Sequence, residues 1–535
     1  MTNVASALAA MLSKAGVSTV FGYPGDPTIE FVERCRETGL DVVSATREAN
    51  AAFMAEAQAM LTGDLGVCLS TLGPGSTALV NGVAAANLDR VPMLALSGQI
   101  ETSRQATFTH QVVDHERMFG AVTKWAGRIE ASAVEVTMRK ALRTAVAERP
   151  GAVHLSVASD IFAREVDTFD PAPPPMLPGR PVPRILASTP DSDPVAVLQA
   201  ARKPLVLAGI GAMRASATSE LVRLAETVGM PIVVSPMAKG VVPEHSTWFA
   251  GVLDMACNKT VWRLVEESDL VVAAGFDPVE LIKPWQVSTP VLHVDSVENT
   301  DQIYASAHEV VGDVAAVVGW LADSFSGEPR WTEAEVAAHR ARLSDDYYAG
   351  RVVGALNPTD VIDAVQEGVP AEAVVTTDVG SHKLLVGQGW RATKPRTVLM
   401  TNGLSSMGFG LPASLAAAMA RPDLPVVSII GDGGFAMAAS ELRLAADRRL
   451  GIVVVVMVDQ SLNRIEIKQA ALGYPSVGTR VPDTAVAAVA EAYGCHGVRV
   501  ETLAELHRAV GERGSLDRPL VVECRIDPAQ YTSQF

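Results

Sequence analysis

The chain has 535 residues, of which 48% are hydrophobic and 19% are charged, and its formal net charge is −16. At roughly 150 residues per domain, this length predicts three or four domains, and the composition is that of a globular protein with well-buried sheets. A strongly negative field repels nucleic acid and anionic membrane surfaces, so we expect neither as a partner.

Cysteine spacing and hydropathy exclude further classes of protein. The cysteines are scattered and form no CxxC pair, which argues against a disulfide framework or a zinc site and fits a reducing compartment. No basic leader precedes the first apolar residues. The longest strongly apolar run, 452–458, is far shorter than the roughly 20 residues of a membrane span. We therefore expect a soluble, cytoplasmic protein.

In chain order, residues 1–14 have the pattern of an amphipathic helix that leads into a strand at 17–21. Short apolar runs then alternate with helical patterns, and each run ends near Gly, Ser or Asp. Buried runs of this length are typical of parallel strands in doubly wound sheets, so the predicted fold class is α/β. The further predicted strands are 66–70, 93–97, 153–157, 205–208, 232–235, 270–274, 291–294, 373–376, 426–430 and 452–458.

Two stretches separate these elements into three parts. Residues 168–183 are rich in proline and are expected to be stiff and extended. Residues from about 324 to 357 are charged, helical in pattern and without a strand, which suits a bridging segment. The predicted domains are therefore 1–168, 185–325 and 355–535, each a doubly wound parallel sheet that is large enough to bury its own core.

The strongest chemical signal follows the predicted strand 426–430, where Gly431, Asp432, Gly433 and Gly434 precede a helical run. Glycines let a ligand approach the backbone, and amides at the start of a helix suit phosphate oxygens. Asp432 would repel a phosphate unless a cation lay between them, and Mg²⁺ prefers such oxygen ligands. A tight structural turn explains this motif equally well when it is taken alone.

A second acid strengthens the functional interpretation. Asp459 comes directly after the next predicted strand, 452–458. Adjacent parallel strands would bring Asp432 and Asp459 to one edge of the sheet, where α/β proteins bind ligands. The sequence therefore favours a site for phosphate and a divalent cation at this edge.

The segment 431–461 resembles the diphosphate and metal motif of thiamine diphosphate enzymes, which opens with Gly-Asp-Gly and closes with Asn-Asn. The resemblance implies that Asp432, the side chain of Asp459 and the carbonyl of Ser461 bind Mg²⁺. It implies that Gly431, Gly433, Gly434 and Leu462 contact the cofactor. Asp in place of Asn at 459 adds a negative charge, so we expect metal binding with altered affinity. A similar change occurs in the flavin-independent, catabolic acetolactate synthases, which this chain also resembles elsewhere.

The N-terminal part contains a matching signal. Residues 47–55 are similar to the segment that carries the family's cofactor-activating glutamate, so the resemblance implies that Glu48 hands a proton to the aminopyrimidine ring. An acid that favours the helix dipole is the alternative. The turns at 21–25 and 72–75 resemble the family's pyrimidine-domain loops, which implies that Pro24, Gly25 and Gly75 lie near the cofactor. Ordinary Gly/Pro turns between secondary-structure elements would explain these segments as well.

Two further segments resemble cofactor loops. Residues 401–412 are similar to the loop that keeps the cofactor bent, which implies that Met407 lies between its rings and that the Ser405 carbonyl accepts from its amino group. A core methionine is the alternative for Met407. Residues 378–382 are similar to a loop on the diphosphate side, where His382 is expected either to contact the cofactor or to be structural.

The resemblance spans nearly the whole chain. It implies a pyrimidine-binding domain at 1–168, a middle Rossmann-like domain at 185–325 and a domain at 355–535 that binds the diphosphate and Mg²⁺. It also implies a homodimer or homotetramer with the active site at the subunit interface.

The middle part contains a strand followed by Gly209 and Gly211, but Arg214 stands where a dinucleotide fingerprint has its third glycine. A tight turn is therefore favoured over nucleotide binding. Residues 276–280 resemble the Asp-Pro-Val-Glu stretch of the flavin-independent acetolactate synthases, so FAD is not expected as a cofactor.

The reaction is predicted from segment 106–125, which resembles that of the acetolactate synthases and implies that Gln111, beside His110, faces the reacting carbon. Asp114 and His115 are nearby, and a solvated helix face explains His115 at least as well. Decarboxylases typically have a His-His pair here and an acid six residues past the metal-binding Asn, where this chain has Ile465. The pattern favours decarboxylation of a small 2-oxo acid followed by carboligation.

Other activities stay open on the sequence. They are simple decarboxylation with release of an aldehyde, a 2-hydroxyacyl-CoA lyase or oxalyl-CoA decarboxylase activity, and a cofactor-binding scaffold without activity. Lys468 is expected either to bind an anionic acceptor or to lie on a solvated helix face.

Overall fold

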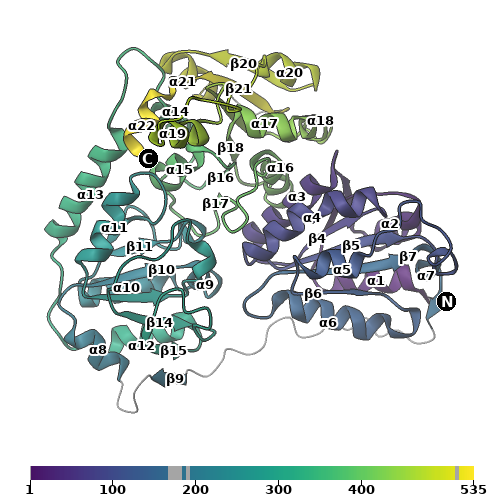
Figure 1. The fold of residues 1–535 in the computed structure, drawn as a ribbon, viewed down its shortest axis with the longest axis horizontal. Coiled ribbons are helices and arrows are strands. Elements are labelled where there is room, and N and C mark those ends of the chain that lie inside the picture. The colour runs from purple at the N-terminus through teal and green to yellow at the C-terminus, as the bar shows by residue number, and fades with distance from the viewer. Residues whose placement is uncertain (1, 167–183, 188–192, 512–516) are drawn as a thin grey trace. The chain divides into compact units, whose positions relative to one another are not determined.

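The computed structural model describes residues 2–166, 184–187, 193–511 and 517–535. Helices alternate with mainly parallel strands, which confirms the predicted α/β class (Figure 1). The chain divides into two compact units. The N-terminal unit consists of Met1–Gly179, Leu404–Pro422 and Ala438–Leu450, and the C-terminal unit of Arg180–Gly403, Asp423–Met437 and Gly451–Phe535.

The N-terminal unit is built on a parallel sheet with the strand order β3-β2-β4-β5-β7-β6. Its first helix begins after Asn3, whose side chain accepts a hydrogen bond from the Ser6 amide and so caps the helix. The short strands β1 (Thr2–Asn3) and β8 (Glu165–Val166) pair antiparallel outside this sheet. The sheet strands are β2 (Thr19–Tyr23), β3 (Asp41–Ser44), β4 (Gly66–Ser70), β5 (Met93–Gln99), β6 (Trp125–Arg128) and β7 (Ala152–Ala158).

Helix α1 contacts both α2 and α6, and helix α3 contacts both α4 and α16 in a second packed group. Helix α16 comes from a later part of the chain, as does α18, and both belong to this unit. The helices are α1 (Val4–Lys14), α2 (Ile29–Thr38), α3 (Glu48–Thr62), α4 (Pro74–Leu88), α5 (His115–Gly120), α6 (Val134–Val146), α7 (Ser159–Phe162), α16 (Gly410–Ala420) and α18 (Leu442–Asp447).

The C-terminal unit contains two sheets. The first has the order β12-β11-β10-β13-β14-β15-β9, in which β9 alone runs antiparallel to its neighbour. Its strands are β9 (Arg184–Ala187), β10 (Pro204–Ala208), β11 (Ile232–Val234), β12 (Phe249–Val252), β13 (Leu270–Ala274), β14 (Val291–Asp295) and β15 (Ser306–Val311). Its helices are α8 (Pro194–Ala200), α9 (Ile210–Arg214), α10 (Thr218–Val228), α11 (Asn258–Glu267) and α12 (Val314–Ser324).

The second sheet of this unit is parallel, with the order β17-β16-β18-β19-β21-β20. Every residue of β19 is buried, as expected for a strand with both faces covered. The strands are β16 (Val374–Thr377), β17 (Val398–Leu399), β18 (Val426–Gly431), β19 (Val453–Val458), β20 (His496–Val500) and β21 (Leu520–Arg525). The helices are α14 (Pro358–Glu367), α15 (Ser381–Gly389), α17 (Asp432–Ala438), α19 (Asn463–Ala471), α20 (Val486–Ala492), α21 (Leu503–Gly511) and α22 (Tyr531–Gln534).

The N-terminal sheet and this last sheet share one topology, in which the strands lie in the order second, first, third, fourth, sixth, fifth. The direction of the connections therefore reverses between β2 and β4 in one sheet and between β16 and β18 in the other. Ligands of open α/β sheets bind beyond the carboxyl ends of the strands at such a switch point. The turns after these four strands are thus the places where a site is expected.

All the strands predicted from the sequence are present, with ends that differ by a few residues. The predicted bridging segment contains α13 (Glu333–Tyr348). A capping box formed by Thr332 and Glu335 stabilises the start of this helix. The predicted linker 168–183 lies outside the described residues. The domain bounds 1–168, 185–325 and 355–535 stay a prediction.

The sequence analysis did not predict β9, and it also missed seven other strands of these sheets. These seven are β3, β6, β12, β15, β17, β20 and β21. Five of them, β3, β6, β12, β17 and β20, are edge strands. An edge strand has a neighbour on one side only and is short or partly exposed, so its sequence lacks the long apolar run of a central strand. Among the described helices, none is both long and apolar enough to cross a membrane.

Candidate functional site

The switch point of the N-terminal sheet gathers several of the predicted residues. Glu48 is the first residue of α3 and is half-buried. A Cβ atom at Gly75, in the turn after β4, would lie 2.8 Å from Glu48 Oε1, so this turn lies directly against the carboxyl group. Gly25, in the turn after β2, lies directly against the side chain of Thr71. The same side chain also lies against Gly75. The half-buried Pro24 precedes Gly25. The predicted pyrimidine-side residues therefore share one end of one sheet.

The start of α3 is held by a residue that sequence reasoning missed. Glu441 is fully buried, and its Oε1 accepts hydrogen bonds from the Thr46 amide at 2.9 Å, from Asn50 Nδ2 at 2.7 Å and from the Thr46 hydroxyl. Thr46 and Asn50 stand on either side of Glu48. Burial raises the pKa of Glu441, and the hydrogen bonds from Thr46 and Asn50 act in the opposite direction. No local pattern reveals this contact, because 395 positions separate Thr46 from Glu441.

Gln111 lies next to the same turn. A Cβ atom at Gly73 would lie 2.7 Å from the Cβ and the carbonyl oxygen of Gln111, whose own φ is +60°. The side chains of Gln111 and His110 are exposed. Asp114 caps α5 by accepting from the Arg117 amide at 3.0 Å.

His115 does not lie on a solvated helix face, which was one of the two interpretations that the sequence left open for it. It is buried, and its Nδ1 lies 2.9 Å from the Ser156 hydroxyl. Burial lowers the pKa of His115 to about 4, so this side chain is a neutral packing residue of the N-terminal unit.

Of the predicted cofactor loop 401–412, residues 404–412 belong to the N-terminal unit. Ser405 has a φ of +53°, and Met407 is half-buried, so it is not a core methionine. Ser406 donates a hydrogen bond to Asn81 of α4 at 2.7 Å, and the rings of Phe409 and Phe53 stack edge to face at 5.8 Å. Packing against α3 and α4 thus fixes the loop.

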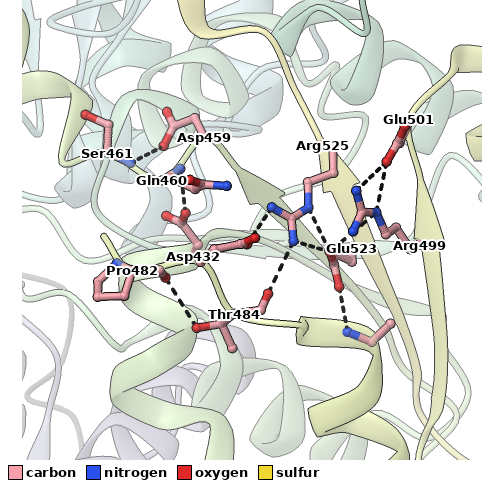
Figure 2. Close-up of polar contacts among 12 residues, drawn as sticks. Asp432, Asp459, Gln460, Ser461, Pro482, Thr484, Arg499, Glu501, Glu523 and Arg525 are labelled. Carbon is pink, nitrogen blue, oxygen red and sulfur yellow. Dashed lines mark hydrogen bonds and ion pairs between the residues drawn. The ribbon is translucent and has the colours of Figure 1, made fainter. Parts of the chain in front are cut away.

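The second cluster lies at the carboxyl end of the last sheet. Asp432 follows β18 and is 7% exposed. Its Oδ1 accepts from the Gly433 amide at 2.8 Å. Its Oδ2 accepts from the Gln460 amide, also at 2.8 Å (Figure 2). Asp459 follows β19, and its Oδ1 accepts from the Ser461 amide at 3.0 Å. The structure therefore brings both predicted acids to one edge, as adjacent parallel strands require.

These two acids are electrostatically costly without a cation. Burial raises the pKa of Asp432. Burial and then the nearby Asp432 raise the pKa of Asp459 to about 7. Because Asp432 opposes the ionisation of Asp459, a hard divalent cation, which prefers carboxylate oxygens, would offset the cost of the two charges. In the described part of the chain no three His, Cys, Asp or Glu side chains form a metal cluster, so a cation here would also use backbone and cofactor oxygens.

His382 lies beside the glycines of the same motif. A Cβ atom at Gly431 would lie 2.9 Å from His382 Cε1, and one at Gly434 would lie 2.0 Å from Asp378 Oδ2. His382 is buried, its Nε2 makes no hydrogen bond, and burial lowers its pKa to about 4. The predicted loop 378–382 therefore adjoins the Gly-Asp-Gly-Gly turn, with a neutral imidazole whose free nitrogen suits a polar ligand.

The segment 459–462 has an unusual backbone. Gln460 has a φ of +58°, a region that costs a residue other than glycine about 1–3 kcal/mol unless its surroundings hold it there. The Leu462 amide donates to the Thr479 carbonyl at 2.6 Å, and Ser461 forms an antiparallel bridge with Arg480. The Ser461 hydroxyl donates to Glu466. Neighbouring residues thus hold the segment at several points.

Helix α19, which follows, has no buried residue. Ile465 is 47% exposed and Lys468 is exposed as well. Ile465 is therefore no core contact within this chain. Leu472, Tyr474 and Val477 further along are also exposed.

In the middle sheet, a carboxyl group occupies the Gly-x-Gly turn after β10. Glu280 is buried and accepts from the Ile210 amide at 3.0 Å, from the Asp277 amide at 3.0 Å and from the Ser235 hydroxyl. Burial raises the pKa of Glu280 to about 8. An amide that would otherwise face a phosphate is engaged by the protein itself, which supports the interpretation of this turn as structural.

Three regions of the chain match the domains of one known family. Residues 2–118 match the N-terminal TPP binding domain of thiamine pyrophosphate enzymes, residues 193–321 their central domain and residues 378–524 their C-terminal TPP binding domain. The first match contains the Glu48 cluster, and the third contains Asp432 and Asp459.

Individual relatives cover almost the whole chain. The catabolic acetolactate synthase of Raoultella terrigena is 31% identical over 536 residues, 98% of this chain and 95% of that one. The putative thiamine pyrophosphate-containing protein YdaP of Bacillus subtilis is 30% identical, covering 97% and 91%. The probable 2-ketoarginine decarboxylase AruI of Pseudomonas aeruginosa is 29% identical, covering 94% and 90%. The chain therefore belongs to the thiamine pyrophosphate enzymes and is a thiamine diphosphate-dependent enzyme of the group that includes the acetolactate synthases.

Proposed function

We propose that the protein decarboxylates pyruvate or a related small 2-oxo acid and joins the remaining fragment to a second carbonyl compound, as an acetolactate synthase does. The observation that carries the proposal is the residue at position 465. Ile465 provides no proton donor where an aldehyde-releasing decarboxylase would need one, and no other acid of α19 takes its place, because Glu466 is bonded to Ser461. The relatedness to acetolactate synthases supports the same reaction.

The residues present fit the cofactor. We propose that Asp432, Asp459 and the Ser461 carbonyl hold Mg²⁺, which binds the diphosphate, while His382, the turn 431–434 and Leu462 contact the diphosphate side. When bound, thiamine diphosphate supplies the carbon that attacks the 2-oxo acid and carries the charge left after CO₂ departs. The chain's own residues orient the reactants.

The remaining roles concern the pyrimidine end and the substrate. We propose that Glu48 holds and transfers a proton at the pyrimidine ring, with Pro24, Gly25, Gly75, Ser405 and Met407 lining that end. Gln111, with His110, orients the acceptor carbonyl by hydrogen bonding, and Lys468 attracts an anionic acceptor. Exposed apolar side chains on and after α19 support a homodimer or homotetramer with the active site at the subunit interface. Light scattering of the purified protein tests this assembly.

A decarboxylase that releases free aldehyde is the second candidate, because a probable 2-ketoarginine decarboxylase is among the relatives. The two functions share every step up to the loss of CO₂. They differ in the group that meets the reacting carbon afterwards, so the products separate them.

The product prediction concerns Ile465. With pyruvate, the wild-type protein should give mainly an acetolactate-like hydroxy acid, and Ile465→Glu should divert product towards aldehyde because it adds a proton donor. Val353→Glu is the control, since it adds the same group at a fully exposed position away from α19 and the segment that follows it. Chromatographic quantification of both products decides the question. Aldehyde as the main wild-type product would favour the second candidate.

The metal prediction concerns Asp432. Thiamine diphosphate binding should require a divalent cation, and Asp432→Ala should weaken it by about 100-fold or more, because the diphosphate loses its charged bridge. Asp459→Asn should retain metal-dependent binding, since an amide oxygen remains available. Calorimetric titrations with and without Mg²⁺ measure both. Unchanged affinity in Asp432→Ala would show that the cation binds elsewhere.

The proton-transfer prediction concerns Glu48. Glu48→Gln keeps the shape of the side chain and removes the transferable proton, so turnover should fall by roughly 10²-fold or more while the fold is retained. Glu33→Gln on the exposed face of α2 serves as the control. Steady-state rates and circular dichroism are the measurements. A wild-type rate in Glu48→Gln would assign proton transfer to another group.

The flavin prediction follows from Glu280. Because its carboxyl group engages the Ile210 amide in the Gly-x-Gly turn, we expect the purified protein to contain no flavin. A visible absorption spectrum of the protein, and of its supernatant after denaturation, tests this. Stoichiometric flavin in either sample would overturn the structural interpretation of that turn.

A further inference from the structure

We propose that Arg525 and Asp483 are positioning residues that clamp the loop 479–484 and thereby hold the segment 459–462 in the conformation that a metal requires. The inference rests on the proposed function of Asp459 and Ser461 as metal ligands. The clamp itself is a property of the protein without cofactor and can be tested on that state.

The segment needs external support because Gln460 has a left-handed backbone between the two proposed ligands. Two hydrogen bonds fix this residue. Its amide donates to Asp432 at 2.8 Å, and its carbonyl accepts from the Val481 amide, also at 2.8 Å. One side of the strained residue is thus held by the proposed metal ligand itself, and the other side is held by the loop 479–484.

Residues 479–481 of the loop pair with residues 460–462 of the segment. The Leu462 amide donates to Thr479, Ser461 bridges Arg480, and Val481 donates to Gln460. These contacts are backbone to backbone and would form for many sequences. Their strength therefore depends on how firmly the loop is anchored at its far end.

That anchor is Arg525, the last residue of β21. In the sheet Arg525 is in register with Val458, the residue directly before Asp459. Its Nη1 donates to Asp483 Oδ1 at 2.6 Å, and its Nη2 lies 3.5 Å from the Thr484 carbonyl (Figure 2). The guanidinium group thus connects the end of the sheet to the end of the loop.

Arg525 is itself held in place. Its Nε donates to Glu523 Oε1 at 2.8 Å, and the side chain of Glu523 is only 2% exposed and also accepts from the Ala487 amide at 2.9 Å. A planar guanidinium with acceptors on two sides has little freedom, which makes it an effective anchor for a loop. The same charge lies close enough to Asp432 to lower the pKa of that carboxyl group, against the larger effect of burial.

The chain contains a matched control for this clamp. Arg499 also lies next to Glu523 and pairs with the exposed Glu501 at 2.5 Å, as Arg525 pairs with the exposed Asp483 (Figure 2). The side chains of Asp483 and Glu501 are 56% and 58% exposed. Both are acids that pair with an arginine near Glu523, but only Asp483 lies in the loop that pairs with segment 459–462.

The experiment compares Asp483→Ala with Glu501→Ala. Hydrogen exchange of the cofactor-free protein should speed up in peptides that cover 460–462 and 479–481 for Asp483→Ala only. The Mg²⁺ concentration for half-maximal thiamine diphosphate binding should rise about fivefold, the upper range for an exposed ion pair, with an unchanged melting temperature. Asp483→Glu, which keeps the carboxylate, should restore both values.

Arg525→Gln should have the larger effect, about 10- to 100-fold on the half-maximal Mg²⁺ concentration, as expected when a group that orients metal ligands is lost. If that variant does not fold, Asp483→Ala still decides. Equal exchange in Asp483→Ala and Glu501→Ala, or faster exchange without any change in Mg²⁺ requirement, would overturn the clamp. If the wild type binds no thiamine diphosphate with Mg²⁺ present, the proposed function fails, while the exchange data still report on the clamp.

Discussion

The carboxyl group of Asp432 is the interaction on which the C-terminal site depends. It stands at the end of β18, accepts the amide of Gly433 in its own turn and accepts the amide of Gln460 across the end of β19. A single side chain therefore ties two adjacent strand ends together and sets where Asp459 and Ser461 lie. Each oxygen keeps a further lone pair, because a carboxylate can accept about four hydrogen bonds or metal contacts. Structural support and cation binding are thus compatible in the same group.

The N-terminal sheet uses the same topology for a different task. Its switch point holds Glu48, an acid at the start of a helix. The neighbouring Glu441 receives hydrogen bonds from the residues on either side of Glu48 and fixes the turn that presents it. One strand order thus places a single acid at the start of a helix in one sheet and paired acids at strand ends in the other. The difference lies entirely in the side chains that follow the strands.

In the middle sheet, the protein itself occupies the backbone amides of a glycine-rich turn that follows a strand. Glu280 engages the amide of Ile210 and the amide of Asp277 and is buried among its partners. With a pKa raised to about 8 by burial, it is a neutral hydrogen-bonding group near neutral pH and avoids the cost of a buried charge. A Gly-x-Gly turn after a strand therefore indicates a nucleotide site only when its amides are free.

The sequence by itself determined the fold class, the central strands and the two acids at neighbouring strand ends, because these features are local. A strand buried on both faces requires an apolar run, and in parallel neighbours the residue after each run must reach the same edge. Asp432 and Asp459 could be paired on that ground alone. The resemblance to thiamine diphosphate enzymes added Glu48, and the structure then placed it beside Gly75.

Tertiary structure alone decided the features that depend on residues far apart in the chain. Four such features leave no periodic pattern in the sequence. They are the burial of His115, the exposure of Ile465, the contact of Glu441 with Thr46 and the anchoring of the loop 479–484 by Arg525. The edge strands were not predicted for a related reason, since a partly solvated strand has no long hydrophobic run. Hydrophobic periodicity records which face of an element is buried, but it does not record which distant polar group meets it. That information arises only when the chain has folded.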